Sequence, residues 1–274
     1  MYILTSDMRK EFVNSLNYNY SPSLLSKQID NRSDIEFAAT HLYAYGTPFV
    51  NRGVRRQQHY TFNQIPQLKN VLYNFINEFY NFFHSHVPKT QSAFDIIHEE
   101  LCNLFLNDTS NAGLKHTYGN AQKMVNILFK YCACFSDAPR YAKWFKYCHM
   151  AIDRYTYNGY RLPFYRYIVL PSLKGSSVGS LQAWSSISNY KDYKNIIDDI
   201  ISYISSKQKT YNDYLYICDQ FSILTNISKL KNNYILTPFE AEFFIWIIAK
   251  ECSKRCGNAY VYNHIIIKKI KALL

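Results

Sequence analysis

The spacing of apolar residues is the feature that most limits the folds open to this chain. Between residues 68 and 83 they recur every three or four positions, as one face of an amphipathic helix requires. Similar stripes begin near Ser92, Gly119 and Tyr190. With only eight Gly and eight Pro in 274 residues, an all-β architecture with many tight turns is disfavoured. The sequence therefore predicts a mainly α fold, a compact helical bundle.

Start and stop signals place further elements along the chain. Pro66 marks a helix start, and the segment Thr237-Pro238-Phe239-Glu240 is a capping box with Pro at the first helical position. That helix is expected to end near residue 256, and a last basic helix is expected over 261–273. Residues 45–61 and 161–179 have the composition of loops. We expect one globular unit over 1–274, or two intimate lobes formed by 1–110 with 180–274 and by 111–179.

Charge indicates the class of partner. The net charge of +11 and the pI near 9.2 favour an acidic partner. The longest apolar run, residues 243–249, is too short to span a bilayer, and the N-terminus lacks the apolar core of a signal peptide. The seven cysteines include no Cys-x-x-Cys pair, which favours free thiols over a metal site. We therefore expect a cytoplasmic monomer with no membrane partner, no metal and no cofactor.

Most of the positive charge lies in one region. Residues 109–174 contain ten Lys or Arg and two acids, Asp137 and Asp153. Asp153 follows the apolar residues 150–152, and a lone carboxylate in basic surroundings suggests a catalytic acid on a surface for a polyanion. Ten of the 27 residues at 141–167 are aromatic and alternate with cations such as Lys143, Lys146 and Arg154. This interleaving suits phosphate contacts combined with base stacking.

The segments at 119–126 and 150–155 resemble the core of helix-hairpin-helix DNA glycosylases. The first is Gly119-Asn120-Ala121-Gln122-Lys123 with Asn126 three residues on, and the second is Met150-Ala151-Ile152-Asp153-Arg154-Tyr155. The resemblance implies a helix-hairpin-helix core and a metal-free hydrolase. Such an enzyme would bind double-stranded DNA, flip out a base, which we expect to be a modified one, and cut its N-glycosidic bond. Repair and antiviral defence are both open as its biological role.

The resemblance also implies roles for individual residues. Gly119, with Asn120 and Gln122 beside it, would bind a DNA phosphate at the helix N-terminus. Lys123 would be the candidate amine nucleophile. Asp153 would be the catalytic carboxylate, which stabilises the cationic sugar as the base departs.

A second basic segment lies near residue 55. No acid occurs from residue 51 through 77, and Arg55 and Arg56 could enter the duplex and fill the gap left by a flipped base. Tyr45, Phe49 and His59 flank them and could line a base pocket. A surface loop with a solvated Arg pair is the alternative.

Each candidate also has a structural interpretation. Asp153 is explained equally by an N-cap, Lys123 by a solvated lysine, and Gly119 by a turn before a helix. The rival function is therefore a non-catalytic helical nucleic-acid-binding protein. A third is a helical interaction protein whose charge is incidental. The serine-hydrolase, Walker and Rossmann motifs are absent from the sequence.

Overall fold

Helices make up most of the part of the chain that the structure describes. The computed structural model describes residues 4–16, 18–45, 65–152, 187–220, 222–224 and 227–256. Within these ranges the one pairing of extended backbone is an antiparallel bridge between Thr210 and Ile235. The predicted mainly α fold is confirmed. The helix-hairpin-helix arrangement of its core stays a prediction.

Contacts between Cα atoms divide the chain into two compact units. Unit 1 consists of Met1–Ala151 with Ser185–Tyr190, and unit 2 of Ile152–Trp184 with Lys191–Leu274. The expected single globule or pair of lobes stays a prediction, and each unit is considered separately below.

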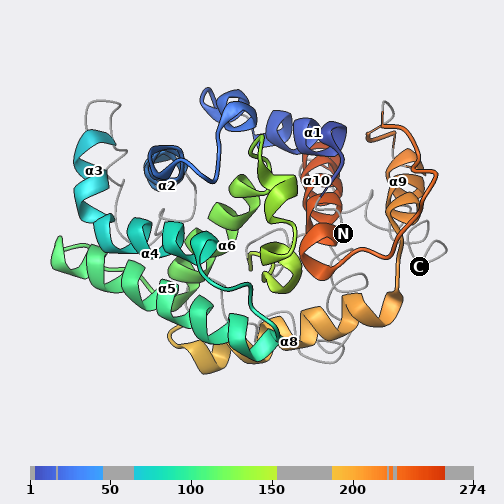
Figure 1. The fold of residues 1–274 in the computed structure, drawn as a ribbon. Helices are drawn as coiled ribbons and strands as arrows, with labels where there is room; N and C mark the ends of the chain where they lie inside the picture. Colours follow the sequence, from blue (N-terminus) through green and yellow to red (C-terminus); the bar gives the residue numbers. More distant parts are fainter. Residues whose placement is uncertain are drawn as a thin grey trace. The chain divides into compact units, whose positions relative to one another are not determined.

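Unit 1 is a bundle built around two central helices. Figure 1 shows its elements in blue to green: α1 (Ser6–Leu16), η1 (Ser21–Ser26), α2 (Arg32–Tyr45), α3 (Ile65–Val71), α4 (Tyr73–His84), α5 (Gln91–Asn111), α6 (Tyr118–Cys132), η4 (Ala138–Tyr141) and η5 (Trp144–Tyr147). Helix α5 packs against α4 and α6, and α2 packs against the same two helices. All but one residue of α6 are buried, so this helix is the centre of the unit.

Aromatic side chains form the core between α4, α5 and α6. Phe79 and Phe129 have ring centroids 4.5 Å apart, and Phe82, Phe83 and Phe94 surround them in edge and tilted contacts. All five are almost fully buried. Ring pairs of this kind add to the stability that comes from burying their area, so the apolar stripe at 68–83 packs as its periodicity predicts.

The helix predicted over residues 68–83 is interrupted in the structure. Leu72, with φ −103° and ψ 20°, separates α3 from α4, and Pro66 lies in the first turn of α3 as expected. The Asp108 carboxylate of α5 accepts hydrogen bonds from Phe75 N at 2.9 Å and Asn74 Nδ2 at 2.9 Å. It thereby satisfies a backbone donor in the first turn of α4.

Both ends of α5 carry identifiable caps. Thr90, one residue earlier than the start near Ser92 suggests, caps the helix through Oγ1, which accepts from Ala93 N at 3.1 Å. At the other end Gly113 has φ +78°. Leu114 N donates to Thr109 O, and Gly113 N donates to Ser110 O, both at 2.9 Å, which is a Schellman motif.

Unit 2 contains α8 (Tyr190–Lys207), which begins at the unit boundary, α9 (Tyr211–Gln220) and α10 (Pro238–Cys256). Helices α9 and α10 pack together, with Tyr214 and Phe244 stacked at 5.4 Å between ring centroids. The predicted capping box is confirmed. Thr237 N donates to Glu240 Oε2 at 2.9 Å, and Glu240 N donates to Thr237 Oγ1 at 3.2 Å. The basic helix expected over 261–273 lies outside the described residues.

Candidate nucleic-acid interface

The segment after α6 folds as two short 3-10 helices held at one end by Asp137. The buried Asp137 carboxylate accepts from Ile29 N at 2.8 Å and from Asp30 N at 3.1 Å. Just before it, Ser136 N donates to Lys27 O at 2.8 Å. These bonds join positions more than 100 residues apart and fix where η4 and η5 begin.

Two aromatic side chains hold the other end of the segment. Trp144 Nε1 donates to Phe82 O at 3.2 Å, next to the end of α4. The Tyr147 hydroxyl donates to Lys89 O at 2.8 Å, in the connection between α4 and α5. Both rings are half-buried, so their polar atoms bond to backbone while part of each ring remains at the surface.

Four exposed cations lie along this anchored surface. Lys143 and Lys146 are exposed on the segment itself, Lys89 is joined to it through Tyr147, and the Arg140 side chain is 71% exposed. Residues 138–152 contain no Asp or Glu. We call the following set the basic aromatic band: Tyr80, His84, Lys89, Arg140, Tyr141, Lys143, Trp144, Lys146 and Tyr147.

One carboxylate, that of Asp30, contacts the band. It forms an ion pair with Arg140 at 2.7 Å, accepts from the Tyr141 hydroxyl and lies 3.8 Å from His84. The Tyr141 hydrogen bond, followed by the Arg140 charge, holds the pKa of Asp30 below its ordinary value. Asp30 is thus ionised at neutral pH and neutralises one cation, which leaves a net positive surface around Lys143 and Lys146.

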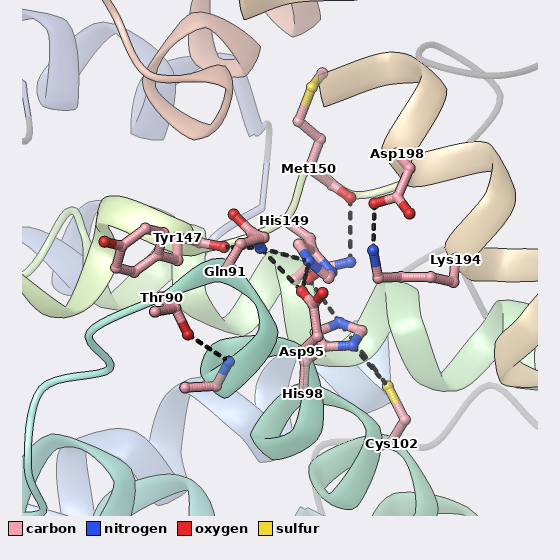
Figure 2. A network of polar contacts seen from close by, with 12 residues as sticks. Thr90, Gln91, Asp95, His98, Cys102, Tyr147, His149, Met150, Lys194 and Asp198 are labelled. Atoms are coloured by element: carbon pink, nitrogen blue, oxygen red, sulfur yellow. Dashed lines mark hydrogen bonds and ion pairs between the residues drawn. The ribbon is translucent and has the colours of Figure 1, made fainter. Parts of the chain in front are cut away.

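A buried polar network lies behind this surface, and Figure 2 shows its side chains converging from α5, α6 and the segment after η5. Gln91 Nε2 donates to Tyr147 O at 3.0 Å and to Asp95 Oδ1 at 2.9 Å. His149 Nε2 donates to the same Asp95 oxygen at 2.8 Å. Asn126 Nδ2 donates to Met150 O at 3.1 Å. Together these bonds fix the backbone of residues 147–150 against both helices.

The hydrogen bonds also determine the state of His98. Asn126 donates through its amide nitrogen to Met150 O and to Gln122 Oε1, so its oxygen accepts from His98 Nε2 at 3.0 Å. The His98 Nδ1 atom then faces the Cys102 thiol at 3.8 Å as an acceptor. Burial, and then repulsion by His149, holds the pKa of His98 well below its ordinary value. Burial likewise raises the pKa of Cys102. The pair is a neutral imidazole and a neutral thiol, which is a packing arrangement and not an activated nucleophile.

The start of α6 differs from the exposed hairpin that the resemblance implies. Gly119 lies inside the helix after the N-cap Thr117, and its N–H donates to Ile187 O at 3.0 Å. Thr117 and Asn120 form a reciprocal capping box. Gln122 Nε2 donates to Gly119 O at 2.9 Å. Gly119, Asn120 and Gln122 are all buried, so in this structure their printed bonds are made within unit 1 and not to a phosphate.

The remaining candidates fall into two groups. Lys123 lies on α6 with its side chain 5% exposed, in contrast to the solvated lysine considered above. Tyr45 is half-buried at the end of α2, with its ring 5.9 Å from that of Tyr20 and 6.2 Å from that of His41. The other candidate residues lie outside the described ranges, and their roles stay predictions. They are Phe49, Arg55, Arg56, His59, Asp153 and Arg154.

Sequence reasoning missed the contributions of Lys89 and of the polar network. Lys89 precedes α5 and reaches the band through a bond to Tyr147, which no local pattern encodes. The network had a weak signal, because Gln91, Asp95, His98 and Cys102 recur at three- and four-residue steps. Among the described residues no group of three or more His, Cys, Asp or Glu side chains could hold a metal ion.

Comparisons with known proteins add no relative: no family model, curated protein or solved structure matches this chain. None of the helices described here is long and apolar enough to cross a membrane.

Proposed function

We propose that this protein binds nucleic acid through the basic aromatic band. The observation that carries the proposal is the joint presence, on one anchored surface, of four exposed cations and two half-buried aromatic rings. Phosphates provide the complementary charge, and bases provide faces that stack on aromatic rings. The network behind residues 147–150 supports the same proposal, since it holds the backbone of the surface in place before any ligand arrives.

Charge reversal at Lys143 and Lys146 tests the proposal. The double substitution Lys143→Glu with Lys146→Glu should weaken binding to a labelled DNA by at least about tenfold, and equally for unrelated sequences, because phosphate contacts carry no sequence information. Fluorescence anisotropy at low salt measures the affinity. The matched control is Lys229→Glu with Lys231→Glu, which makes the same change in charge at two exposed lysines of unit 2. Equal weakening by both pairs, or no binding by the wild-type protein, rejects the band as a binding surface.

Base excision by a glycosylase mechanism is a second candidate function. It is favoured by the bond from Asn126 Nδ2 to Met150 O, which joins the two segments that resemble the glycosylase core. The burial of Lys123 favours a monofunctional reaction, in which Asp153 alone supports departure of the base.

The Asp153→Asn variant tests this second candidate. It should abolish release of a modified base from duplex DNA while affinity is unchanged or higher, because a negative charge near phosphate is removed. Cleavage of abasic sites by heat and alkali reports base release. An N-cap role predicts no change, since Asn caps a helix about as well as Asp, so an active variant would exclude Asp153 as the catalytic carboxylate.

A further inference from the structure

The aromatic rings of the band are held in fixed positions. Trp144 is tied through its indole nitrogen to Phe82 O, and Tyr147 through its hydroxyl to Lys89 O. Because each ring is fixed at its polar atom and packed on one side, its exposed part cannot turn away from the surface. Such a ring accepts a stacked base with little loss of side-chain entropy.

The rings are spaced by cations along a continuous set of contacts. At one end Tyr80 and His84 stack at 4.2 Å between ring centroids, and Asp30 connects them to Arg140. Tyr141, beside Arg140, contacts the Trp144 ring at 5.3 Å. At the other end Lys146 Nζ lies 4.8 Å from the centre of the Tyr147 ring. Rings and cations therefore alternate from the end of α4 to the start of α5.

This alternation distinguishes an unpaired strand from a duplex. In a duplex the base faces are covered by neighbouring bases, so only its phosphates can contact a surface of this kind. An unpaired strand offers both its phosphates and its base faces, and stacking on an aromatic ring contributes to binding for any base. Cations without accessible rings would suit either form equally.

We propose that the basic aromatic band binds an unpaired nucleic-acid strand, with its phosphates on Arg140, Lys143 and Lys146 and its bases stacked on Trp144 and Tyr147. This inference rests on the proposed function and specifies its substrate class. It differs from the expectation of double-stranded DNA drawn from the sequence.

The experiment compares one labelled DNA strand with the same strand annealed to its complement, by anisotropy at low salt. The single strand should bind more tightly. Trp144→Leu and Tyr147→Leu should each weaken binding of the single strand by about 5- to 100-fold, the loss expected for one stacked base, and change duplex binding by less than about twofold. Tyr147→Leu is the safer variant, since it removes an exposed hydrogen bond. Tyr216→Leu is the matched control, because Tyr216 is 48% exposed on α9 of unit 2.

Two results overturn the inference. If duplex and single strand bind equally and the Leu variants affect both alike, the band is a phosphate-binding surface; the proposed function then stands and the substrate class is wrong. If neither form binds the wild-type protein, the proposed function itself fails. Far-ultraviolet circular dichroism of each variant separates a lost contact from a lost fold.

Discussion

Individual buried residues set how the stability of unit 1 depends on pH, and His98 is the clearest case. Its pKa is well below the ordinary 6.5, so the folded chain keeps it neutral while the unfolded chain protonates it as pH falls through 6.5. The unfolded state then binds more protons, and the free energy of unfolding decreases by up to about 1.4 kcal/mol per pH unit below 6.5. His98→Gln removes this titration, so its stability should depend less steeply on pH between 6.5 and 5 than that of the wild-type protein. Urea unfolding at several pH values measures the difference.

The control for this prediction is His86→Gln, at an exposed histidine of the same unit. It should follow the wild-type pH dependence. His41 and His116 also have depressed pKa values, that of His116 about 4, because burial disfavours their charged forms. A residual slope should therefore remain in the His98→Gln variant, and a slope equal to that of the wild-type protein would contradict the assignment of a neutral His98.

Residue roles were predictable from sequence where solvent alone decides them. Lys143 and Lys146 were expected on a charged surface, and both are exposed. The role of Gly119 could not be predicted in the same way, because a helix N-terminus that binds a phosphate and one that binds the carbonyl of residue 187 have the same local sequence. Lys123 was misjudged for a similar reason. The apolar stripe of α6 marks only one face, whereas tertiary packing covers nearly the whole helix.

At the scale of elements, periodicity and capping signals located most of the described helices. The confirmed capping box of α10 depends on residues only three positions apart, which is why sequence was sufficient. The break at Leu72 was not predicted, since the apolar stripe continues through it and the Asp108 carboxylate that bonds the start of α4 comes from a distant helix. The segment at 137–147 depends on bonds to residues 27–30, 82 and 89, so its sequence showed its charge but not its shape.

At the scale of the whole molecule, the sum of the charges predicts binding to a polyanion but does not locate it. The chain carries +11, and residues 109–174 supply +8 of it. Several of those residues, among them Arg154 and Arg161, lie outside the described ranges. The described band therefore accounts for only part of the charge available to a nucleic acid, and the salt dependence of binding can measure how large that part is.

Counterion release turns this into a quantitative prediction. If about five to eight phosphates are contacted, the logarithm of the association constant should fall with the logarithm of salt concentration at a slope of roughly −4 to −7. Each lost phosphate contact should make the slope shallower by about 1, so Lys143→Glu with Lys146→Glu should reduce its steepness by about 2. The control pair Lys229→Glu with Lys231→Glu changes the net charge equally and should keep the wild-type slope. Titrations at about four salt concentrations give the slopes. Equal flattening by both pairs would show that overall charge, and not contact at the band, drives association.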